Sequence, residues 1–148
     1  MRALLQRVSE AGVSVNGGAP RKIGHGLAIL LGVTHDDTQS DVEYLIRKTV
    51  DLRIFNDDDG KMNRSLRDVG GEALVVSQFT LYGDARKGRR PGYSAAAGPD
   101  HAIPLYEQFI RELEAEGVSV QTGEFGADMQ VEIHNDGPVT LMLESPIT

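Results

Sequence analysis

The segment Gly26-Leu27-Ala28-Ile29-Leu30-Leu31-Gly32-Val33 holds the longest apolar run of the chain, Leu27 to Leu31. A continuous apolar run of this length between glycines is typical of a β-strand that is buried on both faces. Upstream, residues 2–15 have extended character, and Asn16-Gly17-Gly18 is a strong hairpin signal that leads to a second arm near residues 21–23. The N-terminal third is therefore predicted to consist of strands.

Two later segments have helical periodicity. A first helix is predicted to begin near Ser40, with Thr38 or Ser40 as its N-cap, and a second helix is predicted over roughly residues 100–116. Residues 72–82 alternate between apolar and polar positions and are predicted as one strand.

The C-terminal tail is predicted as strand, turn, strand, with Asp136-Gly137 as the turn and Val139, Leu141 and Leu143 pointing inward. Many strands, two helices and hairpins at both ends predict an α+β fold. We expect a single domain over residues 1–148, with a largely antiparallel, barrel-like β-sheet and two main helices.

The composition excludes several classes of function. The chain of 148 residues contains no cysteine, which removes thiolate catalysis, disulfides and cysteine-type zinc sites. The four histidines lack metal-ligand spacing, so neither a metal nor a cofactor is predicted. The longest apolar run is far too short to span a membrane, which takes about 20 residues. A soluble, cytoplasmic protein is expected.

Charge limits the kind of nucleic acid that the protein can bind. The net charge of −7 argues against wrapping a duplex, because phosphate contacts require a basic face. The local exception is Arg86-Lys87-Gly88-Arg89-Arg90. An isolated cluster of this kind is usually a solvated loop, but it is also compatible with a small phosphate anchor that grips a few nucleotides at an RNA end.

Two short uncharged segments are candidates for a functional site: Ser77-Gln78-Phe79-Thr80 and Asn135-Asp136-Gly137-Pro138-Val139-Thr140. Neither contains the usual pair of nucleophile and base, but both can supply backbone donors and carbonyls. The ordinary alternatives are a half-buried strand with a polar face for the first segment and a simple hairpin turn for the second. A cis peptide bond before Pro138 is not the default, because only about 5–6% of such bonds are cis in folded proteins.

Several spaced motifs, in order along almost the whole chain, resemble the D-aminoacyl-tRNA deacylase family. These motifs are Gln6-Arg7-Val8, Leu52-Arg53-Ile54-Phe55, Gly60-Lys61-Met62-Asn63, Val76-Ser77-Gln78-Phe79-Thr80-Leu81, Gly123-x-Phe125-Gly126-Ala127-x-Met129 and Asn135-x-Gly137-Pro138-Val139-Thr140. One departure lies after the basic loop, where the family has Arg-Pro-Ser-Phe and this chain has Arg90-Pro91-Gly92-Tyr93. This change affects the expected contacts of the loop.

The resemblance implies hydrolysis of D-amino acids, and of glycine, from mischarged tRNA, as chiral proofreading in translation. It also implies a homodimer with active sites at the interface, which binds the aminoacylated 3′ end of tRNA. The resemblance also implies roles for individual residues. The catalytic pocket segment is Ser77, Gln78, Phe79 and Thr80, and a cis Gly-Pro chirality gate, Gly137 and Pro138, reaches in from the other subunit. Further support of the pocket is expected from Arg7, Met129, Val139 and Thr140, and we add the basic cluster, Arg86, Lys87, Arg89 and Arg90, as the tRNA contact.

The attacking group is left open by the sequence. No base is visible beside Thr80, so we favour a positioning role for Thr80, with attack by water or by the neighbouring hydroxyl of the terminal ribose. Backbone amides near Phe79 and Thr80 are candidate donors to the oxyanion. The competing hypotheses are a non-catalytic binder of acylated tRNA 3′ ends and a purely structural antiparallel dimer.

Overall fold

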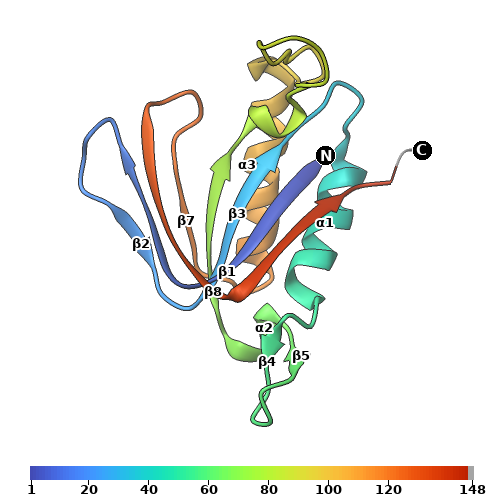
Figure 1. Ribbon diagram of the computed structural model, residues 1–148. Helices are drawn as coiled ribbons and strands as arrows, with labels where there is room; N and C mark the ends of the chain where they lie inside the picture. The colour runs from blue at the N-terminus through green and yellow to red at the C-terminus, as the bar shows by residue number, and fades with distance from the viewer. Residues whose placement is uncertain (147–148) are drawn as a thin grey trace.

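A curved six-stranded sheet with helices on one face forms the body of the protein in the computed structural model, which describes residues 1–146 (Figure 1). Its elements, in chain order, are β1 (Arg2–Val15), β2 (Arg21–Ile23), β3 (Gly26–Gly32), α1 (Gln39–Asp51), β4 (Phe55–Asn56), β5 (Met62–Arg64), α2 (Leu66–Val69), β6 (Glu72–Ser77), the 3₁₀ helix η1 (Phe79–Tyr82), α3 (Pro99–Ala115), β7 (Val120–Thr122) and β8 (Met129–Glu144).

Strand β1 is the hub of the sheet. One of its edges pairs antiparallel with β8 along almost its whole length, while the other edge pairs antiparallel first with β3 and then with β2. Strands β3, β6 and β7 continue the sheet through two parallel pairings. The predicted hairpin after β1 is confirmed: Asn16 and Gly17 both have positive φ, which two-residue hairpin turns favour.

The sheet curls until β2 and β7, the two ends of the strand order, approach each other. Arg21 on β2 bridges this gap: its Nη1 donates to the carbonyl of Thr122 at 2.8 Å, and its Nη2 lies 3.1 Å from the carboxylate of Glu124. The sheet is therefore nearly closed, and the predicted α+β fold with a barrel-like sheet and two main helices is confirmed. The segment 26–32 is buried almost throughout, as predicted, because one of its faces packs against the helices and the other lies inside the curled sheet.

Two hydrophobic clusters lie on opposite faces of β3 and β6, as the alternation of side chains requires. Leu27, Ile29 and Val75 face helices α1 and α3, whereas Leu74 and Val76 face the inside of the curled sheet. Helix α1 begins after Thr38, whose backbone amide donates to the Asp41 carboxylate at 2.8 Å, so Thr38 rather than Ser40 is the N-cap. Within residues 1–146, none of the helices has the length and apolar character that a bilayer span needs.

The predicted strand over residues 72–82 is wrong beyond Ser77. Strand β6 ends there, and residues 79–82 turn into the 3₁₀ helix η1. The Gln78 amide makes a last sheet-like bond to the carbonyl of Leu31 at 2.7 Å, after which the Leu81 amide bonds back to the Gln78 carbonyl. The ladder stops because β3 ends at Gly32, which leaves the following residues without a strand to pair with.

The predicted C-terminal hairpin is also wrong. Residues 129–144 form one strand that pairs with β1 from end to end. Gln6 pairs with Thr140 and Val8 with Asn135, so residues 136–139 bulge out opposite the single residue Arg7. Long-range pairing with β1 on both sides of the bulge prevents the Asp-Gly turn from reversing the chain. Leu141 is exposed rather than inward-facing.

Candidate active site

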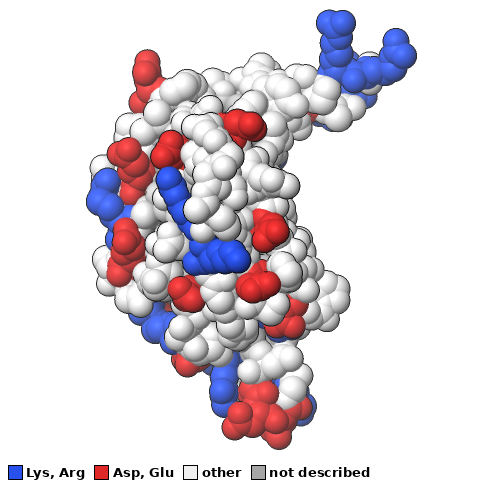
Figure 2. Space-filling view, turned by 90° about the vertical axis from the view of Figure 1, so that its left-hand side faces the viewer, with Lys and Arg blue, Asp and Glu red and all other residues white. Residues whose placement is uncertain are grey.

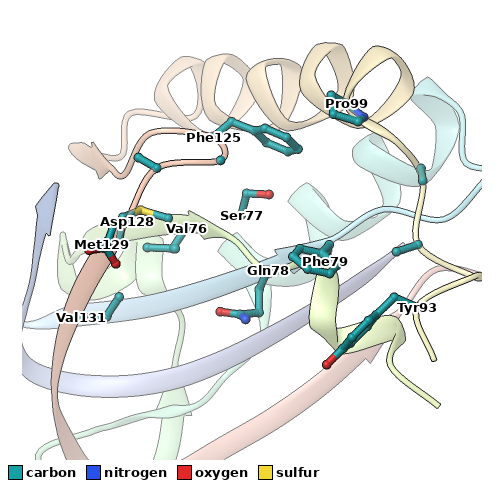
Figure 3. A pocket seen from close by; sticks show the side chains of 14 residues that line it. Val76, Ser77, Gln78, Phe79, Tyr93, Pro99, Phe125, Asp128, Met129 and Val131 are labelled. Atoms are coloured by element: carbon teal, nitrogen blue, oxygen red, sulfur yellow. The ribbon is translucent and has the colours of Figure 1, made fainter. Parts of the chain in front are cut away.

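A pocket of about 650 Å³ opens at the end of β6, a volume within the range of ligand sites (Figure 3). Its walls come from β6 and η1, from the loop before α3, and from the turn that leads into β8. Most of the lining side chains are apolar, and a few polar groups converge on the cavity. The lining residues are Val76, Ser77, Gln78, Phe79, Tyr93, Ala96, Ala97, Pro99, Phe125, Gly126, Ala127, Asp128, Met129 and Val131.

The predicted catalytic segment lies at this pocket. Ser77 ends β6 with its hydroxyl toward the cavity, and Gln78 and Phe79 line the mouth (Figure 3). The Gln78 side-chain amide donates to the Thr80 hydroxyl, so Thr80 stands beside the pocket although it does not line it. Within residues 1–146, the Phe79 and Thr80 amides donate no hydrogen bond, as is normal for the first amides of a helical turn.

An exposed aromatic pair frames the mouth. The rings of Phe79 and Tyr93 meet edge to face, with centroids 5.3 Å apart. Tyr93 belongs to the motif that departs from the family pattern, and its ring takes the place that the family's phenylalanine is expected to fill. The change therefore adds a hydroxyl at the rim and keeps an aromatic surface there.

The opposite wall is the turn from Phe125 to Met129. Asn16 clamps this turn to the first hairpin: its amide donates to the Asp128 carbonyl at 2.8 Å, and the Asp128 amide donates to the Asn16 side-chain oxygen at 3.3 Å. Met129, predicted to support the pocket, lines it. Phe125 was not assigned a role from the sequence, although its motif pointed to this turn; nothing in the sequence marked the alanines before Pro99.

Five other predicted site residues, namely Arg7, Gly137, Pro138, Val139 and Thr140, lie at or beside the bulge of β8 and do not line this pocket. The nearly buried Arg7 donates from Nε to the Asp136 carbonyl at 3.0 Å and from Nη1 to the Ile54 carbonyl at 2.8 Å. The Asn135 side-chain amide donates to the Arg7 carbonyl and to the Val139 carbonyl. Arg7 therefore fixes the bulge from beneath rather than supporting the pocket of its own chain.

Gly137 meets Arg7 directly. It has φ +117°, and a β-carbon at this position would collide with the Arg7 guanidinium. The predicted cis bond between Gly137 and Pro138 is wrong: none of the peptide bonds of residues 1–146 is cis. The four-residue bulge accommodates Pro138 with the ordinary trans isomer. Both residues are exposed, and neither lines the pocket of its own chain. Thr140, predicted to support the pocket, does not line the pocket of its own chain and accepts a bond from Gln6 across the strands.

The basic cluster forms an exposed loop whose base lies next to Tyr93. Asp84 and Gly92 close this loop with two backbone hydrogen bonds, of 2.7 and 2.8 Å. The exposed Arg86 side chain is paired with the Asp84 carboxylate, to which it donates from Nε at 2.9 Å and from Nη2 at 2.8 Å. These bonds lower the pKa of Asp84 to about 2. In Figure 2, Lys and Arg side chains project from the top of the molecule, the level at which Figure 1 shows this loop.

Few charged groups accompany the pocket. Among the described residues that line it, Asp128 is the only charged one. Across residues 1–146, no group of three or more His, Cys, Asp or Glu side chains is arranged to hold a metal ion. Burial raises the pKa of Tyr82, which follows the pocket segment at the end of η1. The chemistry available at the pocket is therefore mainly that of backbone amides, hydroxyls and side-chain amides.

An open, largely apolar pocket with a few convergent polar groups is the form of a ligand-binding or enzymatic site. The family model described as D-Tyr-tRNA(Tyr) deacylase matches residues 4–144. The chain therefore belongs to this family, and the predicted class of enzyme, a deacylase, is confirmed.

Individual relatives agree with the family model. The chain is 59% identical to the D-aminoacyl-tRNA deacylase of Thermus aquaticus over 98% of this chain and 95% of the relative. It is also 59% identical to that of Clostridioides difficile (strain 630), over 98% and 97% of the two chains.

Solved structures extend the comparison to the fold. A structure described as c-Myc DNA Unwinding Element Binding Protein superposes with a TM-score of 0.91 at 41% identity, covering 99% of this chain and 100% of that one. A probable eukaryotic D-amino acid tRNA deacylase superposes with a TM-score of 0.85 at 20% identity, covering 97% and 98% of the two chains. At that identity the second structure supports the fold alone.

Proposed function

We propose that this protein hydrolyses the ester bond of D-aminoacyl-tRNA, releasing the free D-amino acid and the tRNA. The observation that carries the proposal is the family match over residues 4–144, together with a pocket at the matching segment Ser77–Phe79. The activity removes amino acids of the wrong hand before they reach the ribosome. Because charged tRNA is used in the cytoplasm, the protein acts there.

Ester hydrolysis needs a held geometry and donors aimed at the developing oxyanion. The unpaired amides of Phe79 and Thr80 are such donors, and one well-placed donor is typically worth about 10²–10³ in rate. Thr80 accepts a bond from Gln78, and within residues 1–146 no ionisable side chain is bonded to its hydroxyl. We therefore assign Thr80 a positioning role and let water or the neighbouring ribose hydroxyl attack.

Selection of one hand requires a rigid wall close to the α-carbon of the substrate. Gly137 and Pro138 lie outside the pocket of their own chain, so in this proposal they reach the pocket of a second copy in a homodimer. The stiffness of this wall comes from Arg7, which holds the bulge through the carbonyl and the carboxylate of Asp136. Glycine has no side chain to meet such a wall, so glycyl-tRNA is a substrate as well.

Contact with tRNA is assigned to the exposed loop between Asp84 and Gly92. Three of its cations, Lys87, Arg89 and Arg90, are exposed and make no ion pair within residues 1–146, and the loop ends next to Tyr93 at the rim of the pocket, whereas the rest of the protein carries an excess of negative charge. This arrangement suits a narrow grip on the 3′ end of tRNA rather than a long duplex.

The decisive experiment compares hydrolysis of D-Tyr-tRNA and L-Tyr-tRNA by the purified protein. Rapid release of D-tyrosine with little release of L-tyrosine is expected. Equal rates for the two esters would contradict the chiral wall, and binding of D-Tyr-tRNA without cleavage would favour the non-catalytic binder.

A variant tests the role of Thr80. Thr80→Val removes the hydroxyl and keeps the backbone amide, so a rate close to that of the wild type supports positioning. Complete loss of hydrolysis in a folded Thr80→Val protein would count against a role limited to positioning.

A further inference from the structure

Arg2 connects the start of β1 to the 3₁₀ helix η1. Its Nη1 donates to the carbonyl of Leu81 at 2.8 Å, and its guanidinium lies over the ring of Tyr82, 4.5 Å from the ring centroid. Its Nε lies 3.3 Å from the carboxylate of Glu144 on β8. One side chain therefore joins the sheet to the turn that follows the pocket segment.

The backbone of Arg2 is a fixed point for this contact. It pairs with strands on both sides, and its partner on β3 is Gly32. The turn η1 packs on the same glycine: a β-carbon at Gly32 would lie 3.1 Å from the Gln78 carbonyl oxygen and 3.2 Å from the Leu81 β-carbon. The arginine is thus anchored at the place in the sheet on which η1 rests.

The turn η1 itself is short and weakly buried. It has four residues, none of which is buried, and 3₁₀ hydrogen bonds have poorer geometry than α-helical ones. Its ends are closed by bonds from the Leu81 amide to the Gln78 carbonyl, at 3.2 Å, and from the Gly83 amide to the Thr80 carbonyl, at 2.9 Å. Arg2 adds a charge-assisted bond at the C-terminal end, where a cation is favourable.

The orientation of η1 decides where two functional amides point. The amides of Phe79 and Thr80, assigned above as donors to the oxyanion, are the first of this turn, and within residues 1–146 they donate no hydrogen bond. The Phe79 side chain is 52% exposed, so its packing does little to fix the turn. A displacement of about 1 Å in a catalytic group can cost about 10² in rate.

We propose that Arg2 is a positioning residue for the hydrolysis step, which holds η1 so that the amides of Phe79 and Thr80 face the developing oxyanion. The inference rests on the proposed function and adds a residue that does not line the pocket. Because the oxyanion develops only in the transition state, loss of this contact lowers kcat and leaves binding of the ester nearly unchanged.

Kinetics of D-Tyr-tRNA hydrolysis test this role. The Arg2 side chain is 34% exposed, so Arg2→Met should fold; it keeps the apolar stem and removes the donors. Its kcat should fall about tenfold or more, with KM within about twofold of the wild-type value. Arg2→Lys keeps a cationic donor for the Leu81 carbonyl and should recover most of the lost kcat. Glu144→Gln removes the ion pair alone and should keep the wild-type kcat.

The matched control is Arg67→Met. Arg67 is also a partly exposed arginine with ion pairs, but it lies on α2, at the opposite end of β6 from η1 (Figure 1). It should keep the wild-type kcat. Thermal unfolding shows whether each variant is folded. A loss of kcat in folded Arg67→Met equal to that in Arg2→Met would overturn the assignment, because the loss would then follow from any surface ion pair.

Hydrogen exchange reports on η1 independently of activity. In Arg2→Met, the amides of Leu81 and Gly83 should exchange about tenfold faster than in the wild type, while the amides of β6 keep their rates. Loss of kcat without faster exchange at η1 would overturn the inference. A wild type that cleaves D-Tyr-tRNA, with a folded Arg2→Met variant of unchanged kcat, overturns this inference alone. A wild type that cleaves neither ester overturns the proposed function, and the exchange rates then still show whether Arg2 holds η1.

Discussion

Gly137 has no room for a side chain, because the Arg7 guanidinium occupies the place of a β-carbon. Two separate costs therefore arise when this glycine is replaced. The first is backbone strain at φ +117°, which L-residues rarely adopt, and the second is displacement of an arginine that fixes the bulge through Asp136 and Ile54. A glycine with positive φ in open space isolates the first cost. Gly60 is such a residue, with φ +76° and nothing within 4 Å of the place where a β-carbon would stand.

Gly137→Ala should therefore destabilise the protein by about 2 kcal/mol more than Gly60→Ala does, since it also disturbs a nearly buried arginine. Urea unfolding of both variants measures this difference. Gly137→Ala should also lower kcat/KM for D-Tyr-tRNA at least tenfold, while Gly60→Ala leaves it unchanged. If the two variants lost equal stability and kept full activity, Arg7 would not hold a functional wall.

Tyr106 gives the fold an alkaline limit. Its hydroxyl donates to the Val75 carbonyl at 3.1 Å, and burial raises its pKa to about 12. In the unfolded chain the phenol ionises near pH 10. A raised pKa means that the stability from this group is complete below pH 10 and is lost as the pH rises toward 12. Tyr106→Phe should be less stable than the wild type by about 1 kcal/mol at pH 8.

That stability gap should close between pH 10 and pH 12, because only the wild type bears the cost of keeping this phenol protonated. Urea midpoints measured at intervals from pH 8 to 11.5 check the trend. Tyr82, whose pKa is also raised, is present in both proteins and so cancels in the comparison. A gap that stayed constant with pH would contradict the assigned cause.

At the scale of the elements, the sequence correctly predicted those strands whose pattern of apolar residues matches their burial in the fold. The segment 26–32 and the Asn16-Gly17 hairpin form as predicted, since uniform burial and left-handed turn residues are local properties. The strand over residues 72–82 failed at Ser77, because the alternation of apolar residues continues through Leu81 although the partner strand ends earlier. The bulge in β8 was missed because Asp136-Gly137 is a good local turn, which pairing with β1 overrides.

At the site, too, local sequence patterns predicted some residues, whereas long-range contacts could not be predicted. The motif Ser77–Phe79 and Met129 lie at the pocket, but their meeting depends on the turn clamped by Asn16, which no local pattern shows. Arg7 contacts the bulge at Asp136 and Gly137, and the sequence could not show this contact, because a contact across two strands depends on their register.

We expect Arg86 to have a different role from the other cations of the basic loop. Arg86 is bound to Asp84, which stays ionised down to a pH of about 2, so the charge of Arg86 is compensated at neutral pH. Lys87, Arg89 and Arg90 remain available for phosphates. Replacing these three residues with alanine should raise the KM for D-Tyr-tRNA about tenfold and lower the slope of log KM against log salt by about 2.

Arg86→Ala is the matched control, because it removes one cation from the same loop without removing a free one. It should change the salt slope by less than about 0.5. The measurement is KM over a series of salt concentrations. If the triple variant showed the salt dependence of the wild type, the loop would be a solvated surface feature without a role in binding tRNA.

At the scale of the whole molecule, the pocket and the Gly137–Pro138 segment lie on different parts of one chain. Strand β1 connects them: its N-terminal half carries Arg7 beneath the bulge, and its C-terminal end carries the hairpin that clamps the pocket turn. Seen after a quarter turn, the outline of the molecule is concave along one side (Figure 2). In the proposed homodimer, the bulge of each copy completes the pocket of the other.

Shared sites make inactive variants complement each other. Ser77→Phe fills the pocket of its own chain, and Gly137→Val spoils the wall that this chain gives to its partner, so each homodimer should be inactive. Unfolding the two variants together and refolding them at equal concentrations should produce half heterodimers, each with one intact site. About a quarter of the wild-type rate should therefore return, measured as release of D-tyrosine from D-Tyr-tRNA. Each variant refolded alone provides the control. No recovery in a mixture that light scattering shows to be dimeric would place the whole site within one chain, and a monomeric wild type would exclude the shared site altogether.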